Sequence, residues 1–154
     1  MIDEVVADRA AALAALDGRE LARRLALLPH VAAWCTGTGP LRVFLGASTR
    51  NPGRKQLAGA LANPHVQRLT IELLDPAAAQ LLVVIAGRGG SITTAQLAQE
   101  LEPVAPERRE QLVAALADRF LVDEPVPGEP VRLRPGVGDL IGRPGRPLDR
   151  LVLD

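Results

Sequence analysis

Aromatic side chains are almost absent from this chain of 154 residues, which has no tyrosine, two phenylalanines and one tryptophan. Since aromatic residues are favoured in strands, their scarcity argues against a strand-rich sandwich. Aromatic rings are also the platforms on which proteins stack single-stranded bases, so that mode of nucleic-acid binding is disfavoured. The apolar residues are mostly alanine, leucine and valine, which indicates packed helices and predicts a mainly α fold.

Ligands for metals and thiol chemistry are also scarce. The sequence has one cysteine, Cys35, and two histidines, His30 and His65, whereas a structural zinc site uses about four nitrogen or sulfur ligands. No His and Asp pair near Cys35 indicates an activated thiol, so Cys35 is expected to be a small core residue. We therefore expect no metal, no cofactor and no enzymatic activity.

Long apolar runs are missing as well. The longest, around Leu81 to Ala86, is far shorter than the roughly 20 residues that cross a bilayer. The first residues, Met1 to Glu4, lack the basic start and the apolar run of a signal peptide. These features predict a cytoplasmic protein with no membrane partner.

Charge is balanced over the whole chain but not along it. The 18 basic and 18 acidic side chains give a formal net charge of zero, so composition provides no general attraction to nucleic acid. Residues 1–74 carry 9 basic and 6 acidic side chains, whereas residues 75–154 carry 9 and 12. Any binding of DNA must therefore be local, and the C-terminal half is the acidic one.

The strongest local signal is the helix start within Ile92 to Leu97. Thr93 can cap this helix, Gln96 can complete a capping box, and Ile92 with Leu97 forms a hydrophobic staple. We predict a helix that begins within two residues of Thr93.

That helix is the second in a series. Asp75-Pro76 starts a helix that Gly87 to Gly90 ends, and a third helix is predicted from about Pro106 to Phe120. The strand candidates Leu121 to Asp123 and Val131 to Arg134 then enclose a Pro- and Gly-rich loop. The order helix, turn, helix, helix, hairpin is that of a winged helix-turn-helix, although the sequence leaves the hairpin register open.

The N-terminal part is predicted to be helical. Helices are expected over Ile2 to Leu16, from Asp17 with Glu20 closing a capping box, and from Asn51-Pro52 and Asn63-Pro64. The segment Leu41 to Leu45 fits either a short strand or an apolar anchor.

Two side-chain patterns accompany these N-terminal helices. The arginines of the second helix are expected on its outer face; they are Arg19, Arg23 and Arg24. The helix after Asn63 is expected to bury the stripe Val66, Leu69, Thr70 and Leu73. We therefore expect residues 1–74 to form a helical part packed on a winged-helix domain at 75–141, with a linker and short apolar tail at 142–154.

The segment Gly46 to Lys55 lies in the setting of a phosphate-binding loop, but the match fails. A P-loop spaces its glycines more closely and ends in Lys followed by Ser or Thr. The segment still belongs to a basic run without acidic residues, formed by Arg42, Arg50, Arg54 and Lys55. We expect no ATP hydrolysis; this run is either a solvated loop or a place where a DNA backbone phosphate binds.

A winged helix that binds DNA places its third helix in the major groove and its wing along the backbone. The donors available for this role are Arg108, Arg109, Gln111, Arg119, Arg132 and Arg134. Glu107 and Glu110, at the beginning of the same helix, favour the helix dipole but repel phosphate. Duplex binding, if it occurs, is therefore expected to be weak and dominated by the backbone.

Three stretches share their leucine and alanine pattern with a known family: Glu20 to Pro29, Leu57 to Val66, and Leu73 to Ala98. Over about Glu20 to Ile141 the chain resembles the helicase-associated N-terminal domain of bacterial proteins related to XPB-type helicases. The resemblance implies a helical accessory domain that contains a winged helix, engages DNA or a helicase partner, and has no catalytic residues.

Two functions follow from the sequence. The first is a non-enzymatic accessory winged-helix module that is associated with DNA or has a regulatory role. The alternative is a protein interaction or assembly domain that uses the winged helix to contact a partner and does not bind DNA.

Overall fold

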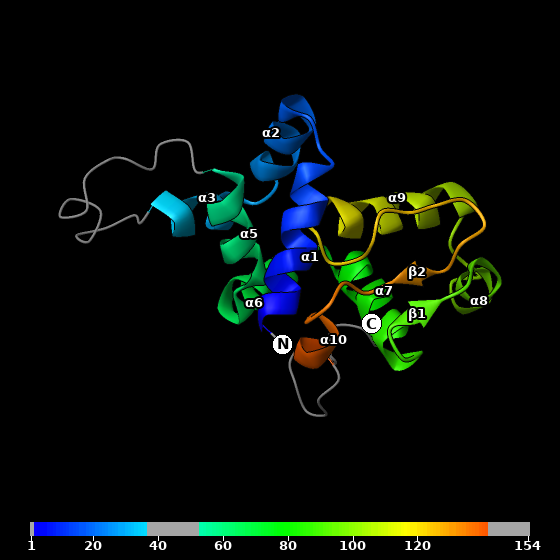
Figure 1. Ribbon diagram of the computed structural model, residues 1–154. Helices are drawn as coiled ribbons and strands as arrows, with labels where there is room; N and C mark the ends of the chain where they lie inside the picture. Colours follow the sequence, from blue (N-terminus) through cyan, green and yellow to red (C-terminus); the bar gives the residue numbers. More distant parts are fainter. Residues whose placement is uncertain (1, 37–52, 142–154) are drawn as a thin grey trace. The chain divides into compact units, whose positions relative to one another are not determined.

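The computed structural model describes residues 2–36 and 53–141. These residues form nine helices and one two-stranded antiparallel sheet (Figure 1), so the prediction of a mainly α fold is confirmed. The chain divides into two compact units, Met1–Thr70 and Ile71–Asp154, where the sequence placed the boundary after Leu74. The expectations for Leu41 to Leu45, for Asn51-Pro52 and for the tail at 142–154 fall outside the described residues.

The described part of the first unit, residues 2–36 and 53–70, consists of helices. They are α1 (Ile2–Ala14), α2 (Gly18–Ala26), α3 (Pro29–Thr36), α5 (Arg54–Ala62) and the greater part of α6 (Pro64–Glu72). α5 packs against α1 and α3, and α2 packs against α3. The buried side chains between them include Leu13, Leu28, Val31, Leu57 and Leu61.

α2 begins where the sequence predicted, but Glu20 does not complete the predicted capping box. Asp17 Oδ1 accepts a hydrogen bond from the Glu20 N–H at 2.8 Å, as a helix cap does. The Glu20 carboxylate accepts instead from Arg23 and Arg24, which lower its pKa to about 2. Arg24 is buried, so its predicted outer position is wrong; Glu20 balances its charge, with Arg24 Nε 3.0 Å from Glu20 Oε2.

α6 begins where Asn63-Pro64 predicted, since Asn63 Oδ1 accepts the His65 N–H at 2.8 Å. Its buried face is rotated from the predicted stripe. Val66 and Thr70 are buried, but the exposed fraction is 40% for Leu69 and 61% for Leu73, so burial of these two was predicted wrongly. The polar residue Gln67 is buried instead, because its amide donates to the Ala62 carbonyl at 2.9 Å.

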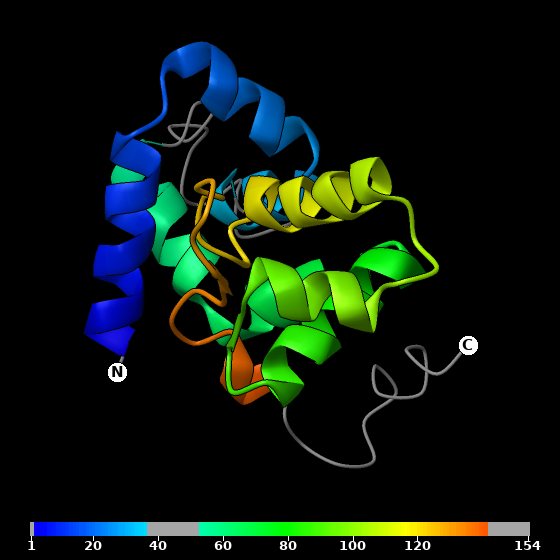
Figure 2. The same ribbon diagram turned by 90° about the vertical axis from the view of Figure 1, so that its right-hand side faces the viewer.

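The second unit is arranged around α7 (Pro76–Gly87). Its other elements are β1 (Ser91–Ile92), α8 (Thr94–Glu100), α9 (Pro106–Asp118), β2 (Val131–Arg132) and α10 (Gly138–Ile141). α7 packs against β1, α9 and α10, and its predicted apolar stripe of Leu81, Leu82 and Ile85 is fully buried. α9 runs without a break (yellow in Figure 2) and contributes Leu112, Val113 and Leu116 to the same core.

The predicted start of α8 is confirmed. Thr93 Oγ1 accepts the Gln96 N–H at 3.1 Å, and Gln96 Oε1 accepts the Thr93 N–H at 3.0 Å, which completes the capping box. Ile92 and Leu97 on either side are buried. These four side chains fix the direction in which α8 leaves β1.

Thr93→Ala is therefore expected to lower the free energy of unfolding by about 1 kcal/mol, because it leaves an amide at the beginning of α8 without its acceptor. Urea denaturation followed by circular dichroism measures this loss. Thr94→Ala is the matched control, since Thr94 lies one residue inside the helix and is also exposed. Equal effects of the two changes would contradict the role of Thr93 as the cap.

The sheet joins distant parts of the second unit. Ser91 lies opposite Arg132 and Ile92 opposite Val131 in an antiparallel register. On the other edge of β2, Val122 forms a bridge with Leu133, and the Asp123 N–H donates to the Arg132 carbonyl at 2.9 Å. β2 therefore lies between β1 and the segment that follows α9. The expected strand Leu121 to Asp123 is reduced to one bridge in which Val122 lies opposite Leu133, and the strand that pairs with β2 is Ser91–Ile92, which was not predicted.

Candidate binding surface

A groove with a volume of about 470 Å³ lies on the second unit between α8, the first half of α9 and the loop Pro125–Glu129. We call it the α8–α9 groove. Most of its lining side chains are apolar, among them Leu97, Pro106, Val113, Val126 and Val131. The charged residues in the lining are Arg109, Glu110 and Glu129.

The two helical walls of the groove are held by buried side chains and one polar contact. Leu97 and Leu101 attach α8 to the core, while Leu112 and Val113 attach α9. Arg109 Nη1 donates to the carbonyl of Ala98 at 3.2 Å, which joins α9 to the end of α8. The guanidinium of Arg109 thus has a structural partner inside the unit.

The third wall is a tight turn. The Glu129 N–H donates to the Val126 carbonyl at 3.0 Å, and Gly128 between them has a φ of 83°. Proline in the second position and a left-handed glycine in the third are typical of a type II β-turn. This turn holds Val126 outward at the edge of the groove, with an exposed fraction of 49%.

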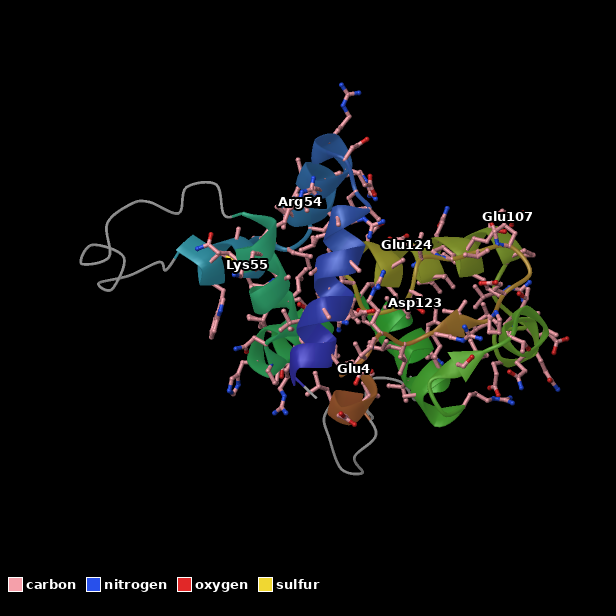
Figure 3. All side chains as sticks on the ribbon, in the orientation of Figure 1. Glu4, Arg54, Lys55, Glu107, Asp123 and Glu124 are labelled. Atoms are coloured by element: carbon pink, nitrogen blue, oxygen red, sulfur yellow. The ribbon has the colours of Figure 1, made fainter. Side chains whose placement is uncertain are left out.

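Three exposed carboxylates lie in the groove lining or close to it. Glu107 and Glu110 are exposed on the first turns of α9, where Figure 3 labels Glu107, and Glu129 is exposed on the loop. No ion pair joins these three carboxylates to a cation within the described part of the unit. Residues 71–141 hold 11 acidic and 6 basic side chains, a formal net charge of −5.

Arg134 was expected among the DNA contacts, but the structure buries it. Its exposed fraction is 7%, its Nε donates to the Val122 carbonyl at 3.1 Å, and its Nη1 lies 3.7 Å from Asp123 Oδ1. The guanidinium of Arg134, two residues after β2, therefore attaches to Val122 and Asp123 in the segment that follows α9. Arg134 is not part of the candidate surface, because a phosphate has no access to its guanidinium.

Three of the arginines expected to contact DNA have partners inside the second unit. Arg108 pairs with Asp75 at 3.4 Å, Arg109 binds the carbonyl of Ala98, and Arg119 Nη1 donates to the Ala115 carbonyl at 2.9 Å. Gln111 and Arg132 are exposed. The outer face of α9 thus offers fewer uncommitted donors than its sequence indicates.

The basic run of the first unit is described only in part. Arg54 and Lys55 lie at the beginning of α5 (Figure 3), and Arg54 donates to the carbonyl of Leu13 near the end of α1. Arg42 and Arg50 lie outside the described residues. The expectation that these four side chains bind phosphate together remains a prediction.

The thiol of Cys35 and the imidazole of His30 each lie beside an oxygen atom of the first unit. Cys35 is half-buried, its Sγ lies 3.7 Å from the Gln56 carbonyl oxygen, and burial raises the pKa of its thiol. His30 Nε2 lies 2.6 Å from Thr70 Oγ1, and burial lowers the pKa of this imidazole. Among residues 2–36 and 53–141, no three metal-ligating side chains gather, and no helix has the length and apolarity to span a bilayer.

Sequence reasoning missed the residues that form the third wall of the groove. Val126, Pro127 and Glu129 were treated only as part of a long hairpin loop. The dipeptide Pro127-Gly128 is a turn signal that predicts a fixed bend at this point. It does not indicate that the bend faces α8 and α9, which is a property of the folded unit.

Comparisons of the chain with protein-family models, with curated proteins and with solved structures give no match.

Proposed function

We propose that the second unit is a winged helix-turn-helix that binds a protein partner, and that the protein is a non-enzymatic accessory or assembly module of the cytoplasm. The element order α7, β1, α8, α9 and β2 supports the winged-helix part of the proposal. The strand pairing supports it too, because β2 lies between β1 and Val122, with Pro125–Glu129 in the position of the wing. A mainly apolar groove beside the wing is a surface suited to a polypeptide.

A protein partner is favoured over DNA by the charges on the face that duplex DNA would contact. In a winged helix that reads DNA, the beginning of the third helix enters the major groove, between the two phosphate backbones. Here Glu107 and Glu110 occupy that position in α9, and Arg109 is bonded to α8. Phosphates are repelled by such a surface, whereas a polypeptide can bind apolar groups that an acidic rim surrounds.

DNA association is the second candidate. Gln111 and Arg132 are exposed, and Arg54 and Lys55 lie at the beginning of α5. The resemblance to helicase-associated domains is compatible with both candidates, since such a domain engages either DNA or a helicase. Under this second candidate, the duplex is bound weakly and without sequence preference.

Fluorescence anisotropy with two unrelated duplexes over a salt series separates the two candidates. We expect no saturable binding of either duplex at about 0.15 M salt. The DNA candidate predicts instead that log K falls with log salt at a slope of about −3.6, which corresponds to roughly four neutralised phosphates. Each exposed arginine that contacts phosphate contributes about one unit to this slope, so Arg132→Ala would reduce it for both duplexes alike.

The same titration tests the placement of the surface. A strong preference for one duplex that disappears in Gln111→Ala would show that α9 reads bases, and it would overturn the protein-binding proposal. Glu72→Gln is the control for a general effect of charge, because Glu72 is exposed and lies outside the groove lining.

A further inference from the structure

We infer that the α8–α9 groove binds a short segment of a partner protein in which apolar side chains are flanked by lysine or arginine. This inference rests on the proposed function and specifies the chemistry of the partner. It follows from three properties of the groove: its apolar lining, its fixed third wall and the sign of the charge around it.

The apolar lining calls for apolar side chains in the partner. Leu97, Val113 and Val131 line the groove from α8, α9 and β2. Leu97 and Val113 are almost fully buried and so present little apolar area to the groove, whereas Val131 is half-buried. The volume of about 470 Å³ lies within the range of sites that hold ligands. Val126 adds an exposed apolar group at the rim, on a turn whose backbone is fixed by a hydrogen bond.

The rigid third wall of the groove favours the binding of one segment in a defined position over non-specific apolar contacts. The Pro127-Gly128 turn restricts the backbone at the rim, so little conformational entropy is lost there when a ligand binds. Arg109 restricts the opposite side by joining α9 to Ala98. The groove is thus organised before the partner arrives.

The charge around the groove selects a basic partner. Glu110 and Glu129 are in the lining and Glu107 lies one turn from Glu110, while Arg109 is the basic residue of the lining and is bonded to a carbonyl. The net charge of −5 over residues 71–141 has the same sign. Lysine or arginine on either side of the apolar residues would face these carboxylates and accelerate association at low salt.

A random 12-residue peptide library displayed on phage tests the inference on the full chain. The library is selected against the protein, and the enriched peptides are synthesised and measured by fluorescence anisotropy. We expect enriched peptides with two or more aliphatic residues and an excess of lysine and arginine. Acidic peptides, or enrichment no higher than on a surface without protein, would overturn the inference.

Two matched pairs of variants locate the binding site. Val126→Glu is expected to weaken peptide binding at least about tenfold, because it replaces an apolar side chain of the groove lining with a charged one. Leu73→Glu makes the same change at an exposed apolar residue outside the groove lining and is expected to leave affinity unchanged. Both positions are exposed, so neither variant disturbs a packed core.

The second pair tests the charge. Glu129→Lys is expected to weaken binding about three- to tenfold at low salt, with a smaller effect at high salt because ions screen the rim. Glu72→Lys is its control, since Glu72 is exposed and outside the lining. Peptides that bind all four variants equally would place the site elsewhere and overturn the inference.

Two other occupants of the groove would give different experimental results. Self-association that Val126→Glu abolishes would show that a second copy covers the groove, and displacement of bound peptide by duplex DNA would show that nucleic acid does; either result overturns the inference. The duplex titration described above is independent of the peptide measurements. Absence of both duplex binding and peptide binding would therefore remove this inference while leaving the proposed protein-binding function in place.

Discussion

Replacing Leu81 with alanine is expected to lower the free energy of unfolding of the second unit by about 3 kcal/mol. Leu81 is fully buried in α7, which packs against β1, α9 and α10, so the truncation leaves a cavity that several elements would have to fill. Urea denaturation followed by circular dichroism measures the loss. Trp34, the only tryptophan, lies in the first unit and reports separately on that unit.

Leu73→Ala is the matched control, because it removes the same atoms from a leucine with an exposed fraction of 61%. Its effect is expected to stay within about 0.5 kcal/mol. The difference between the two variants tests whether Leu81 belongs to the core while Leu73 does not. Similar losses at the two positions would contradict the packing described for α7.

Features that depend on a few neighbouring residues could be predicted from the sequence. The capping box of Thr93 and Gln96 and the helix start at Asn63 are confirmed, because a cap and its acceptor are only a few residues apart. The buried stripe of α7 was also predicted correctly, since Leu81, Leu82 and Ile85 recur with the helical period.

Features that depend on distant partners could not be predicted in this way. Arg24 and Arg134 are buried because each has a carboxylate or carbonyl acceptor beside it, and sequence patterns treat an arginine as a surface residue. The buried face of α6 was misplaced for a related reason. Gln67 is buried although it lies outside the predicted stripe, because the Ala62 carbonyl accepts a hydrogen bond from its amide.

The candidate site also combines features that could be predicted from neighbouring residues with features that depend on distant ones. Glu107 and Glu110 could be placed at the beginning of α9 from their spacing, and they already argued against phosphate binding there. The groove could not be predicted, because its lining comes from α8, α9 and a loop that follows α9. The contact of Arg109 with Ala98, which removes a potential phosphate ligand, likewise depends on how two helices pack.

The end of α9 supports a second stability prediction with a large effect. Phe120 has a φ of 61°, its N–H donates to the Ala117 carbonyl at 3.0 Å, and the Leu121 N–H donates to the Leu116 carbonyl at 3.1 Å. This is a Schellman motif with phenylalanine in the position that glycine usually occupies. Since Phe120 is also buried, Phe120→Ala is expected to lower the free energy of unfolding by about 3 to 5 kcal/mol.

Phe120→Gly removes the same ring but is expected to be less destabilising than Phe120→Ala by about 1 kcal/mol, because glycine adopts a positive φ without a steric penalty. This reverses the usual order, in which alanine is the better tolerated residue. α7 provides the matched control, since Gly89 has a φ of 80° in the same motif and its N–H donates to the Ala86 carbonyl. Gly89→Ala should therefore cost about 1 kcal/mol without any loss of buried side chain. Chemical denaturation of the three variants gives all these differences, and greater stability of Phe120→Ala than of Phe120→Gly would contradict a left-handed conformation at the end of α9.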